Sequence, residues 1–194
     1  LRDEVRHAGR HVLDAPRHLL ADARDLVGHV HDAVQVHAPL ARQRDDLEQI
    51  IAAAGVVCIA GGNVAVLLNR LRLFGLGRAL RARPVVAWSA GAMAIAQRVV
   101  LFHDHPPQGA GNAELFEAGL GLVPGTVFLP HAATRLALDD PQRVTLLARR
   151  LAPDATCTLD DGDQLHWRRG RLADAVGSRR LTRNGTVVAT GPNP

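Results

Sequence analysis

The sequence predicts an α/β domain built on a mostly parallel β-sheet with helices on both faces, finished by antiparallel strands. Apolar runs without polar alternation, such as residues 56–60, are typical of strands that are covered on both faces. Between these runs, apolar residues recur at helical spacing, as Leu47, Ile50 and Ile51 do. Because the two patterns alternate through residues 41–160, we expect one domain over the 194 residues.

The first forty residues give the weakest pattern. Residues 1–30 carry apolar side chains at irregular intervals that are compatible with helix, so we expect an atypical helical N-terminal segment there. Residues 33–36 are a candidate short strand, which Pro39 would end.

From residue 41 onward the helix and strand patterns are clear. Gly55 marks the end of the first helix, because glycine is common just after helix C-termini. Asp140-Pro141 is a suitable N-cap and first-turn pair for a later helix, and Asn184-Gly185 indicates a hairpin. The expected helices span residues 41–54, 64–71, 90–97 and 141–151, and the expected strands span 56–60, 85–88, 126–129, 156–159 and 164–167.

Composition excludes several classes of function. The formal charge of +4 comes from arginines that alternate with acidic residues, and the 3% of aromatic residues argues against a nucleic-acid partner. No apolar run reaches the roughly eighteen residues of a membrane span, so we expect no membrane partner. Cys58 and Cys157 lie in apolar segments without metal-ligand spacing, which favours a reducing cytoplasm over a disulfide framework or a zinc site.

Residues 87–92 place a serine, Ser89, where a buried strand turns into a helix. Small residues flank this serine, so the segment is a relaxed form of the G-x-S-x-G nucleophile elbow. The first turn of the helix leaves N–H groups unpaired, among them that of Ala90, and such groups stabilise a developing oxyanion. A small-residue turn also serves to pack a helix closely on a sheet, so the hexapeptide alone leaves both interpretations open.

Two further polar residues follow predicted strands. His131 comes after the strand at 126–129, and Asp161 comes after the strand at 156–159. The carboxyl ends of parallel strands meet at one edge of a sheet, where loops form a crevice. Together with Ser89, these residues are the nucleophile, base and acid that a serine hydrolase requires, provided that the fold brings them together.

The loop Gly61-Gly62-Asn63 follows another predicted strand. Because Gly62 has no Cβ, its N–H can approach a substrate closely and form an oxyanion hole with that of Ala90. Asp104 is a second candidate for the acid, although its loop ends at two prolines and the residues favour a solvated polar loop over a part of the site. We expect no metal at the neighbouring histidines, because no third ligand is suggested.

The order and spacing of five motifs resemble the peptidase E and cyanophycinase group of serine peptidases over about residues 41–165. They are Ala60-Gly61-Gly62-Asn63, Trp88-Ser89-Ala90-Gly91-Ala92, Gly119-Leu120-Gly121-Leu122-Val123-Pro124, Pro130-His131 and Leu159-Asp160-Asp161. The resemblance implies a class I glutamine amidotransferase-like, flavodoxin-like three-layer fold. It also implies that Ser89 is the nucleophile, His131 the general base and Asp161 the triad acid.

Two features depart from the family pattern. The family commonly carries glutamate where Asp161 stands, and it begins with a strand and a glycine-rich turn that residues 1–30 do not show. The family cleaves peptide or isopeptide bonds next to aspartyl residues. We therefore expect a serine hydrolase that cleaves a small peptide or isopeptide through an acyl-enzyme on Ser89, without a metal or organic cofactor.

The alternative is a catalytically silent glutamine amidotransferase-like module that binds a small ligand or a protein partner through the same crevice. Glutamine amide transfer itself is less favoured, because that chemistry normally uses a cysteine at the elbow and this chain has Ser89. The sequence leaves the exact substrate and the formation of a homo-oligomer open.

Overall fold

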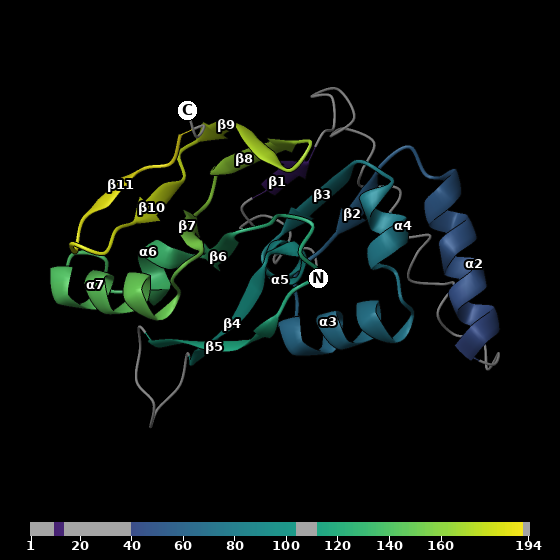
Figure 1. Ribbon diagram of the computed structural model, residues 1–194, viewed down its shortest axis with the longest axis horizontal. Coiled ribbons are helices and arrows are strands. Elements are labelled where there is room, and N and C mark those ends of the chain that lie inside the picture. Colours follow the sequence, from purple (N-terminus) through teal and green to yellow (C-terminus); the bar gives the residue numbers. More distant parts are fainter. Residues whose placement is uncertain (1–9, 14–39, 104–111, 192–194) are drawn as a thin grey trace.

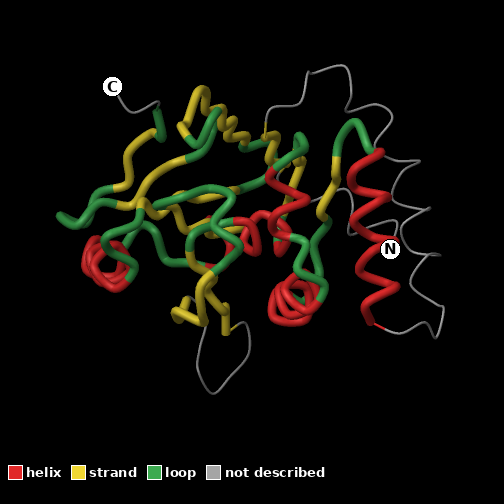
Figure 2. Tube along the Cα trace, turned by 45° about the vertical axis from the view of Figure 1, so that its right-hand side comes forward, coloured by secondary structure: helices red, strands yellow, loops and turns green. Residues whose placement is uncertain are grey.

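The computed structural model describes residues 10–13, 40–103 and 112–191, which form a mixed α/β fold (Figures 1 and 2). The helices are α2 (Leu40–Ala53), α3 (Val64–Leu73), α4 (Gly77–Arg81), α5 (Ala90–Ile95), α6 (Ala132–Arg135) and α7 (Pro141–Arg150). The strands are β1 (Arg10–Leu13), β2 (Val57–Ile59), β3 (Val85–Trp88), β4 (Arg98–His103), β5 (Asn112–Ala118), β6 (Thr126–Pro130), β7 (Ala155–Leu159), β8 (Gln164–Arg168), β9 (Arg171–Val176), β10 (Arg179–Leu181) and β11 (Val187–Ala189).

The strands are divided among three sheets, with the orders β2-β3-β1-β8-β9, β11-β10-β7-β6 and β4-β5. The pairs β2–β3, β1–β8 and β6–β7 are parallel, and the late pairs β8–β9, β7–β10 and β10–β11 are antiparallel. The predicted α/β class and the late antiparallel strands are therefore confirmed. A single, mostly parallel sheet is not observed. The strands form three sheets, and β1–β3 and β4–β5 also pair antiparallel.

Most local predictions from residue 41 onward are confirmed. The strand predicted at 85–88 is β3, and the Asp140 carboxylate caps α7 by accepting hydrogen bonds from the N–H groups of Gln142 and Arg143. The predicted hairpin at Asn184-Gly185 joins β10 to β11. Besides β1, five elements were not predicted, because they are short or mix charged with apolar side chains: α4, β4, β5, α6 and β9.

The helix prediction for residues 1–30 is wrong where the structure describes them. Arg10–Leu13 forms strand β1, which pairs antiparallel with β3 and parallel with β8, placing Val12 opposite both Val86 and His166. Hydrogen bonding to a strand on each side satisfies the backbone of β1 and overrides the weak helical spacing. The candidate strand at 33–36 and the second candidate acid, Asp104, lie outside the described residues.

The buried apolar side chains of the described residues form three clusters, and the two larger ones meet at β6 and α5. Val127 and Leu129 of β6 belong to one cluster with α3, β4 and α7, whereas Phe128 belongs to the other with α2, β3 and β8. Successive side chains of a strand point to opposite faces, so β6 is covered on both sides. In the part of the chain that the structure describes, no helix is long and apolar enough to cross a membrane.

Helix α5 lies at the centre of the fold (Figure 1), and all six of its residues are buried. Its Gly91 approaches β2 so closely that a Cβ built on this glycine would lie 2.2 Å from the Ile59 carbonyl oxygen. At the other end of α5, residues 120–123 donate backbone hydrogen bonds to the last carbonyls of the helix and to that of its C-cap residue, Ala96. Those bonds include Leu120 N to Ala94 O at 2.8 Å, Gly121 N to Ala96 O at 2.9 Å and Leu122 N to Ile95 O at 2.9 Å.

We predict that Gly91→Ala destabilises the protein by about 1–3 kcal/mol, the usual range for overpacking a core. The added methyl group would collide with the Ile59 backbone and force α5 away from β2. Urea denaturation monitored by circular dichroism would measure the change. Gly55→Ala is the matched control, because nothing lies within 4 Å of a Cβ at Gly55. Equal midpoints for both variants would contradict the predicted close packing.

Candidate active site

Ser89 occupies the turn between β3 and α5, as the sequence predicted. Its backbone has φ 52° and ψ −124°, a conformation that residues with a Cβ rarely adopt and that costs on the order of 1–3 kcal/mol. The buried helix holds the turn in place, and the Met93 N–H donates a hydrogen bond of 3.1 Å to the Ser89 carbonyl oxygen. This strained strand-to-helix turn is the geometry of a nucleophile elbow.

Gly61 lies directly against the Ser89 side chain. A Cβ built on Gly61 would lie 3.0 Å from the Ser89 Cβ and 3.1 Å from its Oγ, so the absence of a side chain leaves room for the hydroxyl. The two residues meet because β2 and β3 are parallel neighbours whose carboxyl ends share an edge. The structure thus brings together the predicted nucleophile and the predicted substrate loop.

The rest of that loop is shaped by backbone geometry. Gly62 has φ 126°, a value that strongly favours glycine. The Asn63 Oδ1 accepts a hydrogen bond of 3.1 Å from the Val66 N–H and so caps the start of α3. The side-chain oxygen of this predicted substrate-loop residue is therefore bound within the protein itself.

His131 follows β6 and adopts the left-handed conformation, with φ 55° and ψ 38°. Its N–H donates a hydrogen bond of 2.8 Å to the Leu159 carbonyl oxygen at the end of the parallel neighbour β7. Its Nδ1 lies 4.0 Å from the Asp161 Oδ1, with 29% and 59% of the two side chains exposed. This separation is longer than the 2.7–2.9 Å or so of a charge-assisted hydrogen bond.

Asp160, which the sequence analysis placed in the motif Leu159-Asp160-Asp161 without a role of its own, also contacts this site. Its Oδ1 accepts a hydrogen bond of 2.9 Å from the Ala133 N–H, and its Oδ2 lies 3.3 Å from the Arg179 guanidinium. The adjacent aspartates at the end of β7 were the only sequence signal for it. Because consecutive side chains diverge, Asp160 binds the backbone after His131, whereas Asp161 faces the imidazole.

Asp163 closes the turn that follows β7. Its Oδ2 accepts a hydrogen bond of 2.8 Å from the Asp160 N–H, and its own N–H donates one of 3.0 Å to the Asp160 carbonyl oxygen. Burial raises the pKa of Asp163, and the negative charges of Asp160 and Asp161 act in the same direction. In the described part of the chain, no group of three or more histidine, cysteine, aspartate or glutamate side chains could hold a metal ion.

The two halves of the predicted triad follow strands of different sheets, since β3 belongs to the five-stranded sheet and β6 to the four-stranded one. The core links the two strand ends, because Ala90 and Ala132, the residues after Ser89 and His131, belong to one buried cluster. Among the described residues, no hydrogen bond joins the Ser89 hydroxyl to the His131 imidazole. Such bonds are often long in ligand-free enzymes and shorten when substrate binds.

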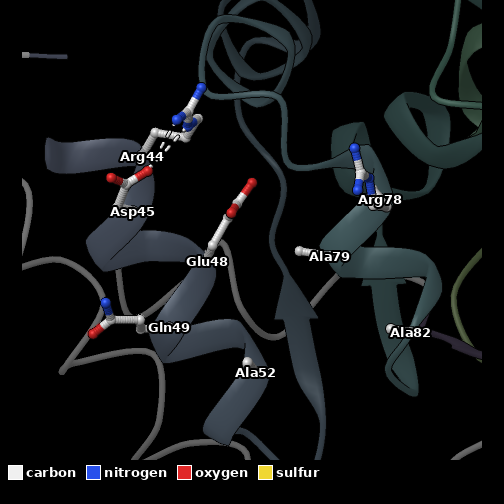
Figure 3. Close-up of a pocket in the computed structure, with 8 residues that line it drawn as sticks. All are labelled: Arg44, Asp45, Glu48, Gln49, Ala52, Arg78, Ala79 and Ala82. Atoms are coloured by element: carbon white, nitrogen blue, oxygen red, sulfur yellow. Dashed lines mark hydrogen bonds and ion pairs between the residues drawn. The ribbon is translucent and has the colours of Figure 1, made fainter. Parts of the chain in front are cut away.

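A separate open cavity of about 760 Å³ lies between α2 and α4 (Figure 3). Glu48 projects into it from α2 and Arg78 borders it from α4, while Arg44 and Asp45 pair with each other at 3.0 Å. None of the predicted site residues lines this cavity. The cavity is therefore distinct from the strand ends that carry Ser89 and His131.

We predict that Asp163→Asn gains stability relative to the wild type as the pH rises from about 4 to 7. The raised pKa of Asp163 means that the fold disfavours its ionised form. Below the ordinary pKa of aspartate, Asp163 is protonated in the folded and the unfolded wild type, and its contribution to stability is fully present. The wild type loses this contribution as the pH rises through the raised pKa of the folded state, whereas Asp163→Asn has no group to ionise. Urea denaturation at both pH values would measure the difference, with exposed Asp174→Asn as the control. If the free energies of unfolding of Asp163→Asn and the wild type differ by the same amount at both pH values, the ionisation of Asp163 does not affect the stability of the fold.

Comparison with known proteins assigns the family. The model of peptidase family S51 matches residues 11–174, a span that includes the elbow, His131 and Asp161. No curated protein matches the chain. The match covers most of the 194 residues and confirms the resemblance noted in the sequence. The chain belongs to peptidase family S51, the family of peptidase E and cyanophycinase, and is a hydrolase of the serine peptidase type.

Proposed function

We propose that this protein hydrolyses a small peptide or isopeptide through an acyl-enzyme on Ser89, with His131 as general base and Asp161 as the triad acid. The observation that carries the proposal is the strained conformation of Ser89, φ 52° at the turn between β3 and α5. A costly backbone conformation is retained where the surrounding packing enforces it, and such positions cluster at active sites. Membership in peptidase family S51 supports the same chemistry.

In the proposed reaction, the His131 imidazole accepts the proton of the Ser89 hydroxyl while Oγ attacks the scissile carbonyl carbon. The N–H groups of Ala90 and Gly62 stabilise the oxyanion that forms. His131 then donates the proton to the leaving amine, and the C–N bond breaks. A water molecule, deprotonated by His131, then attacks the acyl carbon. The bond between that carbon and the Ser89 Oγ breaks, Oγ takes the proton back from His131, and the carboxylic acid product leaves.

Asp161 is favoured as the acid because its carboxylate faces the imidazole, whereas both oxygens of Asp160 contact other groups. A carboxylate in this position selects the imidazole tautomer that can accept a proton and stabilises the imidazolium. The 4.0 Å separation must shorten for this role, and substrate binding can drive that change by excluding water from the exposed Asp161. By family resemblance, aspartyl peptides are the first substrates to test.

The second candidate function is a catalytically silent module that binds a small ligand or a protein partner in the same crevice. The observation that favours it is the loose geometry of the triad, in which His131 and Asp161 are 4.0 Å apart. Chemical labelling of the nucleophile separates this candidate from the hydrolase.

We predict that a serine-reactive fluorophosphonate modifies Ser89 in the purified protein and that His131→Ala slows this labelling. The expected decrease is about 10²- to 10⁴-fold, the usual contribution of a general base. Peptide mapping by mass spectrometry would locate the modified residue, and Ser89→Ala is the control that must remain unlabelled. A folded wild type that resists labelling would favour the silent module instead.

We predict that Asp161→Asn lowers the turnover of aspartyl peptides far more than Asp104→Asn does. The amide keeps the shape of Asp161 but removes the charge that stabilises the His131 imidazolium. The two variants should be compared by kcat/KM on the same substrate. The opposite ranking would assign the acid role to Asp104.

A further inference from the structure

We propose that Asp160 is a positioning residue for His131, a role that rests on the proposed function of His131 as the general base. Three consecutive residues at the end of β7 contact the turn that carries His131. Leu159 O accepts a hydrogen bond from the His131 N–H at 2.8 Å, and Asp160 Oδ1 accepts one from the Ala133 N–H at 2.9 Å. Asp161 Oδ1 then lies 4.0 Å from the His131 Nδ1. We call these contacts the histidine clamp.

The turn needs such support because its own backbone is unfavourable. His131 has φ 55° and ψ 38°, a left-handed conformation in which its Cβ crowds the backbone. The helix that follows, α6, has only four residues, too few to be stable without external contacts. Contacts from outside the turn must therefore hold it, and Asp160 supplies the one side-chain hydrogen bond of the histidine clamp to the backbone.

Asp160 is itself held on both sides. Its Oδ2 lies 3.3 Å from the Arg179 guanidinium, and its N–H donates a hydrogen bond of 2.8 Å to the Asp163 Oδ2. The Arg179 N–H in turn donates one of 3.0 Å to the Thr158 Oγ1, which ties β10 to β7. Because Arg179 occupies one carboxylate oxygen, the other remains directed at the Ala133 N–H.

This arrangement distinguishes Asp160 from a second catalytic acid. The Asp160 carboxylate contacts the Ala133 N–H and the Arg179 guanidinium, so Asp160 acts through the backbone that carries His131. Loss of the Asp160 carboxylate would release the Ala133 N–H and let the turn relax toward a less strained conformation. The imidazole would then move relative to both Asp161 and Ser89.

The test compares Asp160→Ala, Asp160→Asn and the wild type in two assays. Hydrogen exchange of the peptide that contains Ala133, followed by mass spectrometry, reports whether the turn has loosened. Fluorophosphonate labelling of Ser89 over a range of probe concentrations separates the maximal inactivation rate from the affinity for the probe. Asp140→Ala is the matched control, because it also removes a carboxylate that accepts hydrogen bonds from backbone N–H groups, at the start of α7.

We expect Asp160→Ala to exchange faster at the Ala133 peptide and to lower the maximal inactivation rate by roughly 10- to 100-fold, since small displacements of a catalytic group have effects of that size. The affinity for the probe should stay the same. Asp160→Asn retains an oxygen acceptor for the Ala133 N–H and should recover most of the rate. The Asp140→Ala control should keep the wild-type rate although its α7 cap is lost.

Two results would overturn the proposal: unchanged exchange at the Ala133 peptide in a folded Asp160→Ala variant, or faster exchange with a wild-type labelling rate. If Asp160→Ala does not fold, Asp160→Ser replaces it, because the shorter serine side chain cannot reach the Ala133 N–H. The failure of the proposed function gives a different result. In that case the wild type itself is not labelled at Ser89, while the exchange assay still reports on the histidine clamp.

Discussion

The close packing of helix α5 against the end of β2 is the constraint on which the rest of this structure depends. Gly91 allows that approach, because a Cβ at this position would meet the Ile59 carbonyl oxygen at 2.2 Å. All six residues of α5 are buried, so the helix has no freedom to move outward. The strained turn at Ser89 is a consequence, since the chain has only one residue in which to pass from β3 into this helix.

The two sides of the site are held by different forces. On the nucleophile side, steric fit dominates, because Gly61 makes room for the Ser89 hydroxyl and the buried helix enforces the turn. On the histidine side, polar contacts dominate, since the end of β7 meets the turn at His131 through backbone and carboxylate oxygens. Packing is insensitive to pH and salt, whereas carboxylate contacts depend on both. The histidine side is therefore the part of the site that solution conditions can alter.

Much of the fold was predictable because its elements are locally encoded. The strand at 85–88 is apolar throughout, and Asp140-Pro141 carries its own capping chemistry, so both elements appear where they were expected. Strand β1 was not predictable, because Arg10–Leu13 becomes a strand by pairing with β3 and β8, which are distant in sequence. The division into three sheets was missed for the same reason, since strand pairing is a long-range property.

By itself, the sequence determined the turn that carries Ser89, the apolar strands such as β3 and β6, and the resemblance to a serine peptidase family. Each of these depends on short runs of residues whose types and spacing carry the information. Only the tertiary structure decided how the two adjacent aspartates divide their contacts, with Asp161 at the imidazole and Asp160 at the Ala133 N–H. The physical reason is that both aspartates lie in the turn after β7, where their contacts depend on residues from the end of β6, from α6 and from β10 that are distant in sequence.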